Sequence, residues 1–220
     1  MPLCRILLLI VFAMVAVPWY LTPAGAASST PDTRPRIVAF GDSLTSGFGV
    51  PTEASYPAQL QRRLDAIGYT YRVINAGVSG DTTAGGLRRV PWILRNKPEV
   101  VILELGANDG LRGLSIEQTH HNLREIIHRL KEAGVGIVLA GMKLPPNYGR
   151  DYLARFEGIY PSLANEYRLP LIPFFLEGVG GSGSLNQADG IHPTAQGYAL
   201  IVEQVLTILS PLLKLPVRRQ

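Results

Sequence analysis

The stretch that decides the fold is Val38-Ala39-Phe40-Gly41-Asp42-Ser43-Leu44-Thr45-Ser46-Gly47, an apolar run that stops at a small, polar, glycine-flanked turn holding a serine. A buried strand that ends in such a turn is one way to place a hydroxyl group at the mouth of a parallel sheet. The same residues also suit an ordinary turn, because Gly tolerates a positive φ and because Asp and Ser hydrogen-bond their own backbone. The rest of the chain must therefore show whether Ser43 has chemical partners.

Short apolar segments alternate with helical patterns along the chain. This alternation is typical of parallel strands joined by crossover helices, and the near-continuous apolar character of the strands suits burial on both faces. The expected strands are residues 36–40, 71–75, 100–105, 136–141 and 169–174. The expected helices are residues 55–67, 83–95, 116–133, 150–167 and 194–213. We predict an α/β protein with one three-layer α/β/α domain and a five-stranded parallel sheet, flavodoxin-like in arrangement.

The first 26 residues have the pattern of a secretory signal peptide. Arg5 supplies a positive start, residues 6–17 form a short apolar run, and Ala24-Gly25-Ala26 is an Ala-x-Ala cleavage site. The alternative is a retained membrane anchor, but the run is shorter than the roughly 20 apolar residues that a spanning helix needs. We predict cleavage after Ala26 and export to the periplasm, with secretion beyond it as the alternative. The processed protein would then have no stable membrane anchor.

Composition limits the possible partners of the processed chain. Residues 27–35 are rich in Ser, Thr and Pro and predict a flexible lead-in to one folded domain over residues 36–215. Loss of the leader removes Arg5, which leaves 20 Lys and Arg against 17 Asp and Glu; this net charge of +3 is too small to indicate a nucleic-acid partner. The one cysteine, Cys4, is lost as well, which excludes a disulfide and a thiolate metal site. We expect a monomer without metal or cofactor.

Polar and glycine-rich segments follow the carboxyl ends of the expected strands, where open parallel sheets bind their ligands. A serine hydroxyl becomes a nucleophile when a base removes its proton and a carboxylate orients the base. His192 is the candidate base, and Asp189 lies three residues before it, within reach of one turn. The five residues from Asp189 to Pro193 also suit a plain turn at a helix start. The other histidines suit the surface of the helix expected over residues 116–133: His120, His121 and His128.

Two further loops could supply hydrogen-bond donors to an oxyanion. Gly80, after the second strand, can present its N–H without a side chain in the way, and Asn108, after the third strand, carries a neutral amide donor. Each loop alone also suits a turn. Ser43, the two donors and the Asp-x-x-His pair nevertheless follow in order on four loops that the fold would bring to one edge. Their joint occurrence favours hydrolysis through a serine nucleophile.

These segments resemble the sequence blocks of the SGNH, or GDSL, hydrolase superfamily, and the similarity covers nearly all of the chain after residue 26. The matching blocks are Gly41-Asp42-Ser43-Leu44, Gly80, Gly106-Ala107-Asn108-Asp109 and Asp189-Gly190-Ile191-His192-Pro193. Residues 75–82, 104–113, 144–149 and 173–175 are similar to the bacterial periplasmic group known as acyl-CoA thioesterase I, lysophospholipase or arylesterase. The resemblance implies the SGNH hydrolase fold and a serine esterase and thioesterase, with aryl esters, lysophospholipids and acyl-CoA as substrates.

The resemblance also implies a role for each site residue. Ser43 would be the nucleophile that carries an acyl-enzyme, His192 the general base and acid, and Asp189 its orienting partner. The oxyanion hole would be formed by the Ser43 N–H, the Gly80 N–H and the Asn108 side chain. Residues 109–114 are expected to move when an acyl chain binds. The residues expected to line the acyl groove are Leu111, Leu114, Leu144, Pro145 and Tyr148.

One segment departs from this group, and other functions compete. Residues 178–184 are richer in Gly and Ser than the group leads us to expect, which would loosen one wall of the pocket. A carbohydrate O-deacetylase shares the same blocks but would need a short polar pocket. An α/β-hydrolase would have Gly-x-Ser-x-Gly at the nucleophile, whereas Thr45 stands at the second glycine. A phosphate-binding flavodoxin-like domain is disfavoured by the charge of Asp42, and a metal hydrolase by the single histidine outside the third helix.

Overall fold

The computed structural model describes residues 32–215. The predicted signal peptide and residues 27–31 of the predicted lead-in lie outside the described residues, and both remain predictions. Over residues 32–215, no helix combines the length and the apolar character needed to cross a bilayer.

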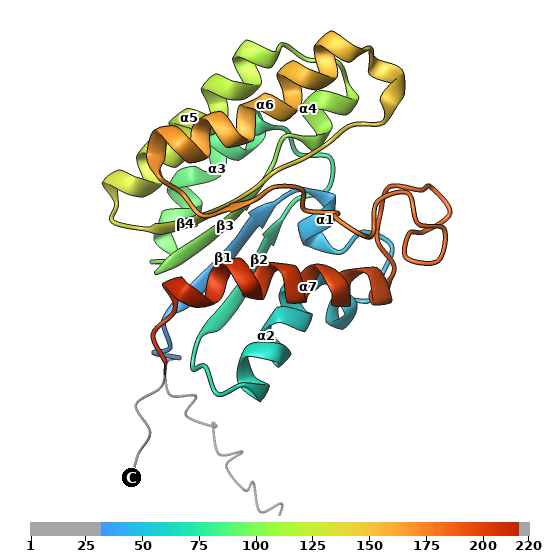
Figure 1. Cartoon of the computed structure of the whole chain (residues 1–220). Coiled ribbons are helices and arrows are strands. Elements are labelled where there is room, and N and C mark those ends of the chain that lie inside the picture. Colours follow the sequence, from blue (N-terminus) through green and yellow to red (C-terminus); the bar gives the residue numbers. More distant parts are fainter. Residues whose placement is uncertain (1–31, 216–220) are drawn as a thin grey trace, which may run out of the picture. The chain divides into compact units, whose positions relative to one another are not determined.

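A five-stranded parallel sheet forms the centre of the fold, as predicted (Figure 1). Its strands, in the spatial order β2-β1-β3-β4-β5, are β1 Arg36–Gly41, β2 Arg72–Gly77, β3 Val100–Glu104, β4 Gly136–Ala140 and β5 Leu171–Ile172. The register places Gly41, the last residue of β1, beside Gly77 of β2 and Glu104 of β3. The carboxyl ends of these three strands therefore meet in one place, next to Ser43.

Strand β5 is shorter than the sequence predicts. It covers only Leu171–Ile172, whereas residues 169–174 were expected to be extended. Pro170 and Pro173 flank it on both sides, and proline has no N–H with which to continue the hydrogen-bond ladder. The chain therefore leaves the sheet early, and residues 173–181 cross the carboxyl edge as a loop.

Helices cover both faces of the sheet and complete the predicted three layers (Figure 1). Helices α2 and α7 pack together on one face, whereas α3, α5 and α6 cover the other. Their bounds are α2 Tyr56–Ala66, α3 Thr83–Arg95, α5 Ile116–Glu132, α6 Arg150–Tyr167 and α7 Ala195–Leu209. The expected final helix, over residues 194–213, ends earlier because Pro211 interrupts it and residues 210–212 form a 3-10 turn.

The loops at the carboxyl edge contain two short helices that the sequence did not predict, α1 (Ser43–Ser46) and α4 (Ala107–Leu111). Single 3-10 turns also occur at Thr52–Ala54 and Pro146–Tyr148. Both short helices start directly after a central strand. Ser43 and Asn108 therefore lie in the first turns of helices rather than in irregular loops.

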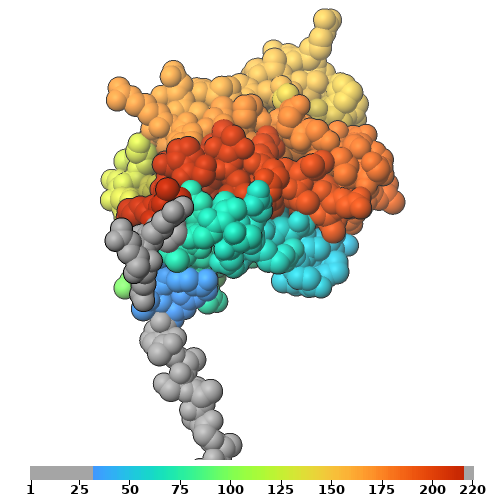
Figure 2. Space-filling model, turned by 60° about the horizontal axis from the view of Figure 1, so that its bottom comes forward, coloured from blue at the N-terminus to red at the C-terminus, as the bar shows by residue number. Residues whose placement is uncertain are grey.

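Helix α7 is fixed against α2, which determines where the preceding residue His192 can lie. Figure 2 shows the two helices side by side, α7 in red and α2 in teal. The Gln59 side chain donates to the carbonyl of Ala195 at 2.9 Å, and Arg63 forms an ion pair with Glu203 at 2.7 Å. Because Ala195 begins α7, the first contact holds the end of the helix that lies nearest to His192.

Candidate active site

Ser43 lies at the junction between β1 and α1. The Asp42 carboxylate caps α1 by accepting the Leu44 N–H at 3.0 Å, which fixes the turn around the serine. A side chain on Gly41 or Gly77 would collide with α1: a Cβ on Gly41 would lie 2.1 Å from Thr45 Oγ1, and a Cβ on Gly77 would lie 2.2 Å from the Ser46 nitrogen. The two glycines therefore allow α1 to rest directly on the strand ends.

The structure brings Ser43, His192 and Asp189 together. His192 Nε2 lies 2.9 Å from Ser43 Oγ, and His192 Nδ1 lies 2.6 Å from Asp189 Oδ2. The other carboxylate oxygen, Oδ1, accepts the backbone N–H groups of Ile191 at 2.9 Å and of His192 at 3.0 Å. With Nδ1 bonded to the carboxylate, Nε2 is left to accept the serine proton. The three residues thus have the geometry of an activated serine nucleophile.

Asp189 is held in its ionised form. Burial alone would raise its pKa, but the backbone N–H groups of His192 and Ile191 and the imidazole outweigh burial and lower the pKa of Asp189 to about 2. The carboxylate therefore stays negative at neutral pH, and it can stabilise an imidazolium ion.

The loop that carries His192 is attached to the loop that follows Ser43. The Gln187 Nε2 atom donates to the Phe48 carbonyl at 2.7 Å and to the Pro193 carbonyl at 3.0 Å, while the Gln187 N–H donates to the His192 carbonyl at 2.7 Å. The Phe48 ring also packs on the imidazole, with the ring centres 4.7 Å apart. Neither Gln187 nor Phe48 belongs to a recognisable motif, so the sequence did not reveal either as part of the site.

The predicted oxyanion donors lie on loops that contact α1. Asn108 Nδ2 donates to Asp42 Oδ2 at 3.0 Å; because an amide nitrogen carries two hydrogens, one remains for a ligand. Gly80 has a positive φ of +77°, and its carbonyl accepts a hydrogen bond from the Arg112 side chain at 2.9 Å. The hydroxyl of the adjacent Ser79 lies 2.9 Å from the Ser46 hydroxyl of α1. Within residues 32–215, no acceptor for the Gly80 N–H or the Ser43 N–H is found. Both groups are thus available to a substrate oxygen.

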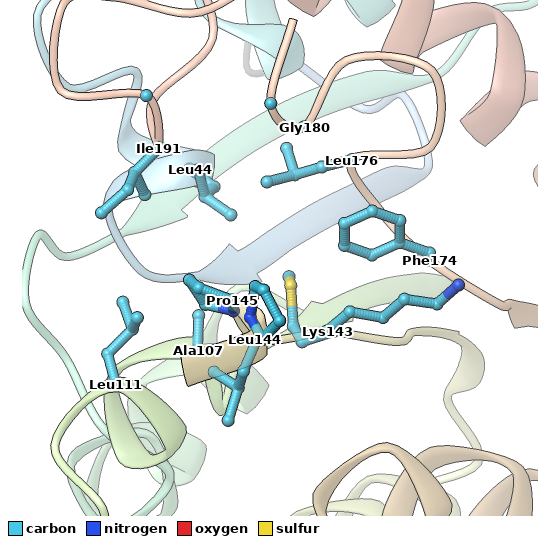
Figure 3. A pocket seen from close by; sticks show the side chains of 14 residues that line it. Leu44, Ala107, Leu111, Lys143, Leu144, Pro145, Phe174, Leu176, Gly180 and Ile191 are labelled. Carbon is cyan, nitrogen blue, oxygen red and sulfur yellow. The ribbon is translucent and has the colours of Figure 1, made fainter. Parts of the chain in front are cut away.

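An apolar cavity of about 490 Å³ begins beside these residues (Figure 3). It is lined by Leu44, Ala107, Leu111, Met142, Lys143, Leu144, Pro145, Pro146, Phe174, Leu176, Gly180, Gly181, Gly190 and Ile191. Figure 3 shows Leu44, Leu111 and Ile191 toward one end, with Phe174 and Lys143 toward the other. Because Leu44 and Ile191 adjoin Ser43 and His192 in the sequence, the cavity extends away from the nucleophile.

Three of the five predicted groove residues line this cavity, and two do not. Leu111, Leu144 and Pro145 are lining residues, whereas Leu114 is 41% exposed and Tyr148 lies outside the lining. The Tyr148 hydroxyl instead donates to the Leu111 carbonyl at 2.9 Å, which holds the end of α4. Gly180 and Gly181, from the glycine-rich segment 178–184, form part of the cavity wall.

The remaining histidines lie away from this site. His121 and His128 are exposed on α5 and His120 is half-buried there; His128 lies 3.3 Å from Glu132 on the same helix. Over residues 32–215, no group of three or more His, Cys, Asp or Glu side chains is arranged to hold a metal ion.

The fold and the Ser43–His192–Asp189 arrangement are those of a serine hydrolase with a three-layer α/β/α fold. Residues 39–200 match the model of the GDSL-like Lipase/Acylhydrolase family. The chain belongs to this family, and it is an enzyme that hydrolyses carboxylic esters and acyl thioesters.

Similar proteins support the assignment. The chain is 44% identical to Esterase TesA of Pseudomonas aeruginosa over 178 residues, which cover 80% of this chain and 89% of the relative. It is 39% identical to Thioesterase 1/protease 1/lysophospholipase L1 of Escherichia coli K12 over 193 residues, which cover 87% and 88% of the two chains. A crystal structure of TesA, 44% identical, superposes with a TM-score of 0.78 over 81% of this chain and 99% of the other.

Proposed function

We propose that this enzyme cleaves esters and thioesters of apolar acyl chains through an acyl-enzyme on Ser43. The observation that carries the proposal is the 2.9 Å contact between Ser43 Oγ and His192 Nε2 at the start of an apolar cavity. The contact supplies an activated nucleophile, and the cavity supplies a place for the acyl chain. The proposed reaction uses the side chains of the site, the backbone N–H groups of Ser43 and Gly80, and a water molecule.

In the first half of the reaction, His192 Nε2 removes the proton of Ser43 as the serine oxygen attacks the acyl carbonyl carbon. The carbonyl oxygen becomes an oxyanion, which would receive hydrogen bonds from Asn108 and from the N–H groups of Ser43 and Gly80. When the intermediate collapses, the imidazolium gives its proton to the departing alcohol or thiol. Asp189 remains ionised throughout and stabilises the imidazolium.

The second half repeats these steps with water. His192 takes a proton from a water molecule that attacks the acyl-enzyme, the same donors bind the second oxyanion, and Ser43 regains its proton as the carboxylic acid leaves. One water is consumed, and one ester or thioester bond is broken in each cycle.

The lining of the cavity supports an acyl chain as the group that binds there. Leu44, Leu144, Phe174 and Leu176 present hydrocarbon to its interior, and Lys143 is the single charged residue among the lining residues. We propose aryl esters, lysophospholipids and acyl-CoA as substrates; the Escherichia coli relative is itself named a thioesterase and a lysophospholipase. A sugar O-deacetylase is the alternative, and its acetyl group would leave most of the cavity unfilled.

We also propose that the protein is exported and acts as a monomer. The proposal rests on the signal-peptide pattern of residues 1–26 and on the mild net charge of the processed chain. The enzyme would then act in the periplasm, or beyond it if it is secreted, with neither a membrane anchor nor a nucleic-acid partner. N-terminal sequencing of the protein from periplasmic extracts should begin within a residue or two of Ala27, and an intact Met1 would argue against export by cleavage.

Two measurements test the proposed function. A fluorophosphonate probe should label Ser43, and labelling and ester turnover should both disappear in Ser43→Ala while Ser162→Ala, on the surface of α6, retains both. A panel of short-chain and medium-chain nitrophenyl esters, acyl-CoA and acetylated sugars should show faster turnover of the acyl substrates. Labelling at another serine would overturn the mechanism, and faster deacetylation of sugars would overturn the substrate class.

A further inference from the structure

Beneath Ser43 lies a fully buried carboxyl group, Glu104, that the hydrolytic steps do not use. Its Oε2 atom accepts the Thr45 hydroxyl at 2.6 Å and the Asp42 N–H at 3.3 Å. Asp42 and Thr45 lie on either side of Ser43, so one oxygen of Glu104 holds both ends of the turn that presents the nucleophile. A Cβ on Gly41 would lie only 2.4 Å from this oxygen, which explains why the residue opposite Glu104 in the sheet is a glycine.

The second oxygen, Oε1, has a different environment. Over residues 32–215, it receives no hydrogen bond from an N–H or a hydroxyl group. The Asp42 carboxyl group, which is itself fully buried, belongs to the residue whose N–H donates to Glu104 Oε2, and its charge raises the pKa of Glu104. Two neighbouring carboxyl groups away from water cannot both be ionised without strong repulsion, whereas a proton shared between them makes their interaction attractive.

The position of the proton follows from the donors around each group. Asp42 accepts the Leu44 N–H and the Asn108 amide, both at 3.0 Å, so both of its oxygens have donors of their own. Oε1 of Glu104 has none. Burial raises the pKa of Glu104 well above its usual value and the Asp42 charge raises it further, while burial raises the pKa of Asp42 to about 6. The proton therefore resides on Glu104.

We propose that Glu104 is a positioning residue of the oxyanion hole that works as a neutral carboxylic acid. One oxygen accepts from Thr45 and from the Asp42 N–H, and the other donates its proton to the Asp42 carboxylate. This hydrogen bond fixes the carboxylate, which in turn holds the amide of Asn108 at 3.0 Å. The inference rests on the proposed function, since it concerns the donor that would bind the oxyanion.

The physical consequence concerns the second hydrogen of Asn108 Nδ2. An oxyanion donor contributes most when it points at the developing charge before the reaction begins. If Asp42 were free to turn, Asn108 would lose its fixed orientation, and the donor would have to be ordered anew in each transition state. Glu104 therefore acts on turnover through two intervening side chains, without touching the substrate.

The tyrosine hydroxyls near Glu104 and Asp42 do not supply a hydrogen bond that could replace the shared proton. The Tyr160 hydroxyl donates to the Leu105 carbonyl at 3.1 Å, and the buried hydroxyls of Tyr56 and Tyr198 form no hydrogen bond with Glu104. The Arg and His side chains near the pair are bound elsewhere: Arg89 binds Asp81 and the Gly41 carbonyl, and His192 binds Ser43 and Asp189.

The test compares three variants of the full-length enzyme. Glu104→Gln reproduces the neutral acid, because its amide oxygen can accept where Oε2 does and its amide nitrogen can donate where Oε1–H does. We expect this variant to keep kcat within about threefold of wild type, whereas Glu104→Ala should lower kcat about 10- to 100-fold with KM changed less than about threefold. Asp109→Asn is the matched control, since this buried carboxylate only accepts, from the Thr83 N–H and the Thr83 hydroxyl, at 2.8 and 2.5 Å. In Asp109→Asn, the new amide N–H groups would face the donors of Thr83. The Tm of Asp109→Asn should therefore fall further below that of wild type than the Tm of Glu104→Gln does.

A spectroscopic measurement reports the proton directly. The infrared difference spectrum of wild type minus Glu104→Gln at pH 7 should contain the C=O band of a protonated carboxylic acid, shifted in D2O. Absence of that band, or a loss of kcat in Glu104→Gln as large as in Glu104→Ala, would overturn the proposal. The infrared band and the kcat of Glu104→Gln test the proposal even when Glu104→Ala does not fold. If Ser43 were not labelled by the fluorophosphonate, the proposed function would fail instead, whatever the band shows.

Discussion

The side chain of Gln187 donates a 2.7 Å hydrogen bond to the carbonyl of Phe48, and this contact joins the loop that carries the histidine to the loop that follows the serine. The two residues are 139 positions apart in the sequence. Because the imidazole has to meet Ser43 Oγ within hydrogen-bond distance, the relative position of these loops should limit the rate.

Replacing Gln187 by Leu removes the contacts to both the Phe48 and Pro193 carbonyls while keeping most of the side-chain volume. We expect kcat/KM for a nitrophenyl ester to fall about tenfold, because a displaced base approaches the serine less often in a reactive geometry. Steady-state kinetics measure the effect. Gln118→Leu, on the exposed start of α5, should keep the wild-type value; an equal loss in both variants would contradict the role of the Gln187 contacts.

Replacing Asn108 by Ala removes the proposed amide donor and also leaves Asp42 Oδ2 without its partner. We expect kcat to fall by about 10²- to 10³-fold with a much smaller change in KM, because the donor acts mainly on the oxyanion of the transition state. The matched control is Asn165→Ala on the exposed face of α6, which should leave both constants unchanged. A rise in KM with unchanged kcat would show that Asn108 serves substrate binding instead.

Replacing Asp189 by Asn should lower kcat about 10⁴-fold, since a neutral amide does not hold the imidazole in the required tautomer. The same substitution changes the pH dependence of stability. The folded-state pKa of Asp189, about 2, lies below its ordinary value, so the ionised group stabilises the fold above about pH 4 and loses this contribution as the pH falls toward 2. Solvent screening reduces the effect, because the side chain is 39% exposed.

Thermal unfolding from pH 5 to pH 2 tests this second effect. The difference in Tm between wild type and Asp189→Asn should be largest at the upper end of this range and shrink as the solution becomes more acidic. A difference that stays constant with pH would mean that ionised Asp189 does not stabilise the fold.

Replacing Gly180 by Leu should shorten the acyl chain that the enzyme accepts. Gly180 lines the cavity, and a Cβ there would lie 3.3 Å from the Phe174 ring and 3.4 Å from Leu176, so a larger side chain would occupy cavity space. We expect kcat/KM to fall about tenfold or more for medium-chain nitrophenyl esters and to change little for the acetate. Gly183→Leu is the control, because a Cβ there meets nothing within 4 Å and Gly183 does not line the cavity. Equal losses for both esters would indicate a general disturbance of the site.

The sequence predicted the sheet and the covering helices because their patterns are local. Apolar β-branched runs such as Val100–Glu104 and the spacing of apolar residues in Ile116–Glu132 specify their elements within a few residues. The short helices α1 and α4 were missed because a single helical turn has too few residues to show a period. Strand β5 was overestimated because its apolar character continues past the prolines that end it.

The nucleophile, the base and the oxyanion donors could be predicted from the sequence, on the loops that follow the strands. The residues that hold these groups in place could not. Glu104 contacts residues 59 and 62 positions away, so nothing near it in the sequence reveals its partners. A glutamate at the end of an otherwise apolar strand was the available signal. Tyr148 was expected in the groove because an acyl hydrolase needs a long apolar one, and only the fold shows that its hydroxyl holds the Leu111 carbonyl.

The wall of the cavity and the hydrolytic groups are encoded in largely separate parts of the chain. Residues 142–146 and 174–181 form much of the wall, yet neither segment contributes a side chain to the contacts among Ser43, His192 and Asp189. A Cβ at Gly183, just after the second segment, would meet no neighbour within 4 Å, whereas Gly178 and Gly181 have φ of +72° and +77°, which favour glycine. Insertions in this second segment can therefore diversify substrate choice, in nature or in directed evolution, while the catalytic geometry is inherited unchanged.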